Sequence, residues 1–99
     1  MYRMLVMFPT TADPMLVEDL VQRTAARFKK LPGYQSITTS VDALMGPSAR
    51  ACVVSRIMEA TFGSLDDALS ALDDTGFDEV RTSIESLEPT LLLYEVAEL

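Results

Sequence analysis

The sequence predicts an α+β domain whose elements follow the order β-α-β-β-α-β, a split βαβ arrangement with a four-stranded antiparallel sheet and its helices on one face. Three short apolar runs, at residues 2–8, 51–62 and 90–96, are too continuous for strands that are exposed on one face. Two longer segments, residues 13–31 and 64–87, show apolar residues on a helical period instead.

The first helical segment starts and stops at recognisable signals. Asp13 is a favoured N-cap residue, and Pro14 suits the first turn of a helix. Pro32 restricts the residue before it, so we expect the helix to end near Leu31. Gly33 then permits a tight turn, and we expect it to adopt a backbone conformation that other residues tolerate poorly.

The next segment predicts a hairpin. Residues 34–41 are rich in β-branched side chains and have one polar side, which indicates a strand at or near an edge of the sheet. Residues 43–50 contain Gly46 and Pro47 and are predicted to form the hairpin loop. The apolar strand at residues 51–62 should then pair antiparallel with the strand before it.

The second helical segment also has a clear beginning. Ser64 is a favoured N-cap residue, and Asp66 and Asp67 follow in the first turn, where the helix dipole favours negative charge. Thr75-Gly76 interrupts the helical period, and Pro89 ends the segment before the last strand.

These elements leave one face of the sheet without a cover. Two helices can cover only one face, yet three of the strands are apolar on both. A soluble monomer rarely leaves a contiguous apolar patch of that size open. We therefore expect the second face to pack against the same sheet of another copy, in a closed two-fold homodimer.

Composition narrows the class of protein. The 99 residues have the length of one domain, which we place at residues 1–99. The formal net charge of −7 argues against nucleic-acid binding, which needs a clustered basic face. One cysteine and no histidine exclude an internal disulfide, fit a reducing, cytoplasmic compartment, and give no reason to expect a metal or another cofactor. No stretch is long enough to span a membrane.

Two motifs resemble the EthD-like family of the dimeric α+β barrel superfamily, whose members have a ferredoxin-like fold. Residues 29–34, Lys-Lys-Leu-Pro-Gly-Tyr, are similar to the family's helix that ends in a Leu-Pro-Gly turn. Residues 62–69, Phe-Gly-Ser-Leu-Asp-Asp-Ala-Leu, are similar to its Phe-x-Ser entry into the second helix. Chain length and strand order extend the resemblance over nearly the whole chain.

The resemblance implies a homodimer whose two sheets face each other, with a pocket between each sheet and its own helices. It also implies relatives that include small decarboxylases, isomerases, cyclases and cofactor-free monooxygenases, beside members of unknown function. EthD-like proteins often have a histidine in the first helix, seven residues before the leucine of Leu-Pro-Gly. This chain has Thr24 at that position, which gives little support to histidine-dependent catalysis.

Arg56 is the first candidate site residue, because it lies in an apolar strand in phase with Val54 and Met58. A charge on a buried face needs a ligand or a partner. Arg56 could anchor an acidic or enolate group in the pocket. The commoner alternatives are a structural ion pair with Glu59 or Glu95, or a bulge that turns the side chain to solvent.

Four more residues complete the candidate pocket: Tyr34, Tyr94, Thr24 and Cys52. Each tyrosine could orient a substrate oxygen, although a tyrosine with its ring in the core and its hydroxyl at the rim is commoner. Thr24 could bond a ligand, or its own helix backbone. Cys52 has apolar neighbours and no histidine to activate it, so we expect a small buried hydrophobe rather than a nucleophile.

Two functions from different classes remain open. The first, which we favour, is a non-catalytic homodimer, a binding or structural module with a small hydrophobic pocket. The second is a cofactor-independent enzyme that acts on a small aromatic or polyketide-like substrate. A sealed apolar core under the helices would favour the first, and an open cavity in which Arg56 and a tyrosine hydroxyl converge would favour the second.

Overall fold

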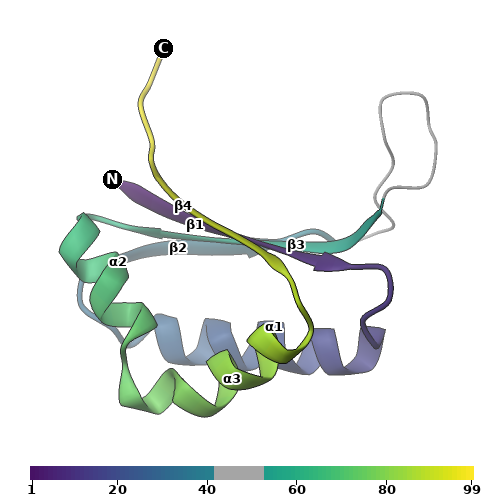
Figure 1. Ribbon diagram of the computed structural model, residues 1–99. Helices are drawn as coiled ribbons and strands as arrows, with labels where there is room; N and C mark the ends of the chain where they lie inside the picture. Colours follow the sequence, from purple (N-terminus) through teal and green to yellow (C-terminus); the bar gives the residue numbers. More distant parts are fainter. Residues whose placement is uncertain (42–52) are drawn as a thin grey trace.

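Four strands form one antiparallel sheet, and the helices lie together on one of its faces (Figure 1). This computed structural model describes residues 1–41 and 53–99. The strands are β1 (Tyr2–Pro9), β2 (Tyr34–Thr39), β3 (Val54–Phe62) and β4 (Thr90–Glu95). The helical elements are α1 (Pro14–Phe28), α2 (Leu65–Leu72), the short 3-10 helix η1 (Thr75–Phe77) and α3 (Asp78–Ser86). The spatial order of the strands is β2-β3-β1-β4, so the predicted fold is confirmed.

The register of the strands decides which side chains face the helices. β1 pairs antiparallel with β3 and with β4, so that Met4 lies opposite Ala60 on one side and Leu93 on the other. Even-numbered residues of β1 from Met4 to Phe8 are buried beneath the helices, and the odd-numbered residues point to the other face. β2 lies at an edge of the sheet, as its polar side predicted.

α1 begins as predicted and ends earlier than predicted. The backbone N–H of Met15 donates to Oδ1 of Asp13 at 3.0 Å, which caps the helix. The helix stops at Phe28 rather than near Leu31. The N–H groups of Lys30 and Leu31 bond to carbonyls three residues back, so the last turn tightens before the proline and no longer counts as α-helix.

The second helical segment is divided at the expected place. Ser64 caps α2, since its Oγ accepts a hydrogen bond of 3.1 Å from the N–H of Asp67. η1 occupies the predicted interruption and α3 follows it directly. α3 is followed by Glu88, which has a positive φ of 54° just before Pro89.

The strands differ from the predicted bounds only at their ends. β2 stops at Thr39 instead of residue 41, and β4 stops at Glu95 instead of residue 96. β1 extends one residue further than predicted, to Pro9, and β3 begins at Val54. The predicted hairpin loop at residues 43–50 lies outside the described residues, as do the first two residues of the predicted third strand.

The Leu-Pro-Gly turn confirms the prediction made for Gly33. Its φ is +79°, in the left-handed region that glycine occupies without a steric penalty. The carbonyl of Gly33 also accepts a hydrogen bond of 2.9 Å from the N–H of Gly63. The turn after α1 is therefore bonded to the connection between β3 and α2.

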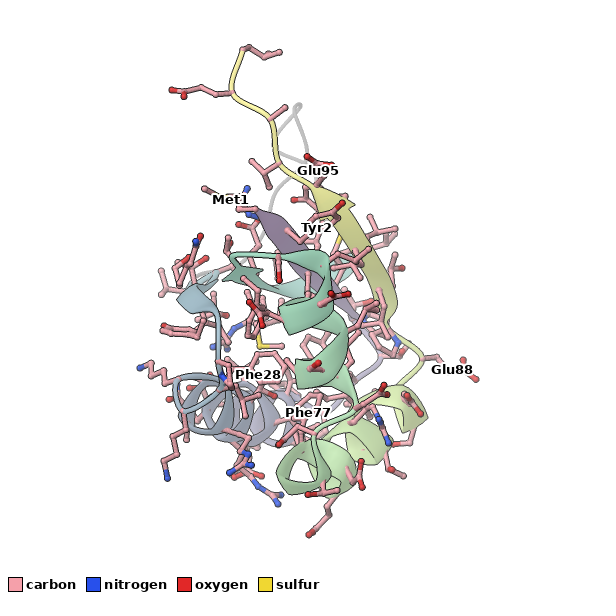
Figure 2. The ribbon with its side chains drawn as sticks, turned by 90° about the vertical axis from the view of Figure 1, so that its left-hand side faces the viewer. Met1, Tyr2, Phe28, Phe77, Glu88 and Glu95 are labelled. Carbon is pink, nitrogen blue, oxygen red and sulfur yellow. The ribbon has the colours of Figure 1, made fainter. Side chains whose placement is uncertain are left out.

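Three aromatic rings hold one end of the core together. Phe28 and Phe77 lie against each other between the helices (Figure 2), with their ring centroids 4.7 Å apart. Phe28 also meets Phe62 edge to face, at a centroid distance of 5.5 Å. Such pairs stabilise a core beyond the area that they bury. The three rings thus join α1, η1 and β3.

No described helix covers the other face of the sheet (Figure 1). Leu5 lies opposite Leu92 and Met7 opposite Ile57, and these four residues point to that face together with Tyr94. Leu92 and Tyr94 keep 49% and 38% of their surface exposed. The face is therefore partly apolar and open to a partner. Among the described residues, no helix has both the length and the apolar character that crossing a membrane requires.

Candidate apolar pocket

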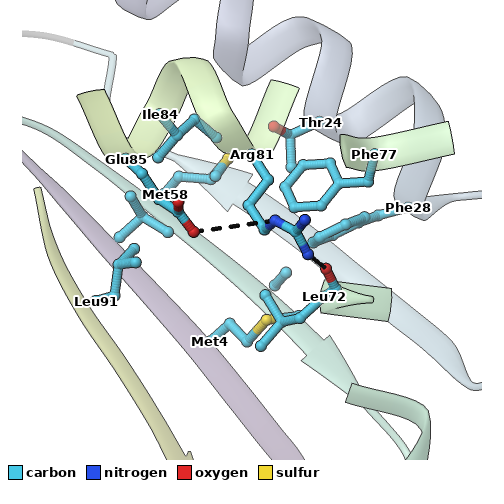
Figure 3. A pocket seen from close by; sticks show the side chains of 12 residues that line it. Met4, Thr24, Phe28, Met58, Leu72, Phe77, Arg81, Ile84, Glu85 and Leu91 are labelled. Atoms are coloured by element: carbon cyan, nitrogen blue, oxygen red, sulfur yellow. Dashed lines mark hydrogen bonds and ion pairs between the residues drawn. The ribbon is translucent and has the colours of Figure 1, made fainter. Parts of the chain in front are cut away.

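A small cavity lies between the sheet and the helices that cover it (Figure 3). Its volume is about 40 Å³, measured as the space that the centre of a water molecule can reach. Twelve residues line it: Met4, Val6, Thr24, Phe28, Met58, Ala60, Leu72, Phe77, Arg81, Ile84, Glu85 and Leu91. A pocket for a drug-sized ligand is roughly 300–1,000 Å³, so this cavity accepts only a small group or one end of a larger molecule.

The periodicities of the helices and strands determine which residues line the cavity. Alternation along β1 and β3 turns Met4, Val6, Met58 and Ala60 toward the helices and makes the floor. Thr24 and Phe28 are four residues apart on α1, and both are buried. Glu85 and Leu91 are exposed, and the partly buried Arg81 lies beside Glu85, so the cavity opens at this side.

The interior of the cavity is apolar. Thr24 is the one polar residue of the lining that is fully buried, and its Oγ1 donates to the carbonyl of Leu20 at 2.7 Å. Its hydrogen is therefore already used within α1, as the backbone alternative predicted. The remaining inner surface comes from methionine, aliphatic and phenylalanine side chains, which can hold an apolar group by packing alone.

Arg81 is the residue at the mouth that the sequence analysis did not single out. Its Nη1 donates to the carbonyl of Leu72 at 2.6 Å, and its Nη2 donates to Asp78 at 2.9 Å (Figure 3 shows the first contact). Its Nε lies 3.9 Å from the carboxylate of Glu85, beyond hydrogen-bond distance. The guanidinium thus caps the end of α2 from α3. The sequence does contain a signal for Arg81, because residues 77 and 81 are four apart and therefore lie on the same face of a helix.

Arg56 does not line the cavity. Its Nη1 lies 2.6 Å from a carboxylate oxygen of Glu18 on α1, and its Nε donates to Oγ1 of Thr39 at 2.7 Å. The ion-pair alternative named Glu59 or Glu95, and the observed partner is Glu18 instead. Hydrogen bonds from Gln22 and then from Arg56 lower the pKa of Glu18 below its ordinary value.

The other candidate residues that the structure describes, Tyr34 and Tyr94, lie in different parts of the fold. Tyr34 is half-buried beside Phe62, with ring centroids 6.4 Å apart, and does not line the cavity. Tyr94 points to the uncovered face of the sheet. Cys52 lies outside the described residues. Of the four proposed residues that lie in the described part of the chain, Thr24 is the one that lines the cavity. Within the described residues, no group of acidic or cysteine side chains is arranged to hold a metal ion.

An ion pair between α1 and the residue before η1 holds Phe77 in place at the wall of the cavity. Arg27 of α1 donates through Nε and Nη2 to the two carboxylate oxygens of Asp74, at 2.6 and 2.8 Å. Gly76 makes this approach possible, because a Cβ there would lie 2.5 Å from the guanidinium carbon of Arg27. The hydrogen bonds from Arg27 hold the pKa of Asp74 below its ordinary value.

An Asp74→Asn variant is expected to be less stable than the natural chain at neutral pH and to approach it in acid. A carboxylate with a lowered pKa stabilises the fold above its unfolded pKa of about 4, and this contribution disappears as pH falls through the folded pKa. Urea unfolding at about pH 7 and about pH 3 measures the difference. Asp73→Asn is the matched control, because the Asp73 side chain is 87% exposed. A gap between Asp74→Asn and the natural chain that is equal at both pH values would contradict the assignment.

This chain is similar to known proteins in its three-dimensional structure. No protein-family model and no curated protein matches the sequence. SnoaB, a cofactor-independent oxygenase from Streptomyces nogalater, has a TM-score of 0.78 at 22% identity, over 99% of this chain and 94% of its own. An EthD family protein from Bacillus halodurans has a TM-score of 0.74 at 13% identity, over 98% and 99%. A dimeric ferredoxin-like protein of unknown function from Thermobifida fusca has a TM-score of 0.71 at 12% identity, over 96% and 90%.

These likenesses concern the fold, since all three identities are low. They cover nearly the whole length of each protein. A shared fold does not imply a shared function. The resemblance seen in the two sequence motifs is thereby confirmed at the level of architecture. In its fold, this chain is similar to a dimeric ferredoxin-like protein and to an EthD family protein.

Proposed function

We propose that the protein is a homodimer that binds a small apolar, oxygen-bearing ligand between each sheet and its own helices, without acid–base chemistry from its side chains. The observation that supports this most directly is the apolar interior of the cavity. Thr24 is already bonded to its own helix, and Arg81 and Glu85 stay at the mouth. Among the lining residues, no acid, base or nucleophile stands inside the cavity where a ligand could react.

The uncovered face of the sheet supports the homodimer. Leu5, Met7, Ile57, Leu92 and Tyr94 form an apolar patch there, and the sheet of a second copy would cover it. The named dimeric neighbour has the same fold, which agrees with this arrangement. Two facing sheets would bury on the order of 1,500 Å², within the range of stable dimers.

Xenon is expected to enter the cavity, because dry apolar cavities take up this atom. Under xenon pressure, the methyl NMR signals of Met4 and Met58, which both line the cavity, should shift. The signal of Met15 is the internal control, since Met15 is 83% exposed on α1 and is not one of the lining residues. If the Met4 and Met58 signals stay in place while the fold remains intact, the cavity does not accept apolar ligands and the proposal fails.

A cofactor-independent oxygenase is the second candidate. It is favoured by one observation, the likeness in fold to SnoaB together with an apolar cavity. Some oxygenations need only an apolar pocket around a substrate that can give up an electron to oxygen. Oxygen uptake with a small apolar substrate that readily gives up an electron, compared with the uncatalysed rate, separates the two candidates. Binding without faster uptake supports the binding module, and faster uptake supports the oxygenase.

A further inference from the structure

The cavity continues into a second apolar hollow beside β4. This groove has a volume of about 140 Å³ on the same measure. It shares Met4, Val6, Leu72 and Leu91 with the cavity, so the two spaces meet where the cavity opens. From there the groove follows β4 to Leu93. The exposed fraction of Leu91, 52%, keeps this junction open to solvent.

The sizes of the two spaces restrict the shape of an occupant. The inner cavity of about 40 Å³ holds about three water-sized groups. A dry cavity of roughly 150 Å³ is what one benzene ring occupies in an engineered protein, so a ring cannot enter this inner space. The end of an unbranched chain can. The groove, which spans residues 91 to 93 or about 7 Å of strand, then accommodates the rest of the chain.

The charges at the mouth restrict the head group. Arg81 contributes one positive charge, and three carboxylates surround it: Asp78 at 2.9 Å, and Asp73 and Glu85 at 3.9 Å each. The guanidinium is thus more than balanced by its neighbours. The groove starts at this mouth and extends about 7 Å along β4, which is less than the Debye length of about 10 Å at 0.1 M salt. An anionic head at the far end of the groove would therefore still meet the net negative field of this cluster, while an uncharged head would not.

We propose that the ligand of this site is an unbranched alkyl chain with an uncharged, oxygen-bearing head group, whose methyl end enters the cavity while its body lies along β4. This inference rests on the proposed function and names the class of its ligand. Two features support it independently: the narrow inner space joined to a longer groove, and the excess of carboxylates around Arg81.

The test compares eight-carbon probes that differ in one property at a time. Calorimetric titration of the natural chain with 1-octanol and cyclooctanol, both dissolved as monomers, separates chain from ring at equal carbon number. We expect 1-octanol to bind about tenfold or more tightly than cyclooctanol. Octylamine should bind about tenfold more tightly than octanoate at low salt, and this difference should shrink in concentrated salt, which screens the field.

A blocking variant tests the location. Leu91→Trp places an indole at the junction of cavity and groove and should abolish octanol binding. Leu69→Trp is the matched control, because Leu69 is 44% exposed on α2 and lines neither space. Should Leu91→Trp fold poorly, the comparison of octanol with cyclooctanol in the natural chain still decides the question.

The outcomes separate the two proposals. Equal binding of octanol and cyclooctanol, tighter binding of octanoate than octylamine, or unchanged octanol binding in Leu91→Trp would each overturn the inference. If neither alcohol binds but xenon shifts the Met4 and Met58 signals, the alkyl-chain inference fails and the apolar pocket stands. If xenon also has no effect, both proposals fall.

Discussion

A Gly33→Ala variant is expected to lose about 1–3 kcal/mol of unfolding free energy from its left-handed backbone alone. Gly33 has a φ of +79°, and a Cβ added there would lie 2.6 Å from Cβ of Asp67 and closer still to the Asp67 carboxylate. The turn must then shift or Asp67 must move, which adds to the loss. Either movement disturbs the hydrogen bond between the Gly33 carbonyl and the Gly63 N–H. Thermal unfolding should show a lower Tm, by several degrees for each kcal/mol in a chain of this size.

Gly63→Ala provides the control for this prediction. A Cβ at Gly63 would have its nearest contact at 3.5 Å, with the side-chain nitrogen of Gln35, which is an ordinary packing distance. The two variants add the same methyl group at two glycines that are joined by a backbone hydrogen bond. We expect Gly63→Ala to melt close to the natural chain. Equal Tm values for the two variants would show that neither the φ nor the Asp67 contact constrains Gly33.

The natural chain is expected to be a dimer at micromolar concentration, with a mass near twice the 10.9 kDa of the chain. Leu92→Arg should convert it to a monomer, because it places a charge within the apolar patch of the uncovered face. An unpaired charge buried in an interface costs about 3–5 kcal/mol, so the dissociation constant should rise by roughly 100-fold or more. Light scattering over a concentration series measures both masses.

Leu69→Arg controls for the charge itself. Leu69 is exposed on α2, on the opposite side of the sheet from Leu92, and its substitution should leave the mass unchanged. Circular dichroism of Leu92→Arg should retain the α+β spectrum, which would separate dissociation from unfolding. If the natural chain is a monodisperse monomer, the proposed homodimer and the proposed packing of its two sheets face to face are both wrong.

Local signals predicted most of the fold. The N-caps Asp13 and Ser64 act on backbone groups two or three residues away, so residue type and spacing are sufficient to identify them. The left-handed conformation of Gly33 follows in the same way from its place after a proline. The end of α1 was less predictable, because the change from α-helical to 3-10 hydrogen bonds before Pro32 leaves no mark in the apolar pattern.

The candidate site was harder to predict because it is assembled from distant parts of the chain. Arg56 was correctly suspected to need a partner, yet Glu18 comes from the helix packed over the sheet, and its closeness depends on tertiary packing. Thr24 and Arg81 lie on separate helices, and their shared cavity exists only once both pack on β1 and β3. The helical period places Arg81 four residues after Phe77, but only the packed structure shows that both line the same cavity.

The position of β4 at the edge of the sheet has a consequence for the chain before assembly. Residues 91–93 present three consecutive leucines on a strand whose outer backbone groups have no neighbouring strand in the described fold. Such an edge is a template for unwanted strand pairing between chains. Pro89 precedes the run and Glu95 follows it, in the positions where natural sequences place residues that interrupt aggregation. The concentration of newly made chains therefore acts in two opposing ways, since it drives dimer formation and it also brings these exposed edges together.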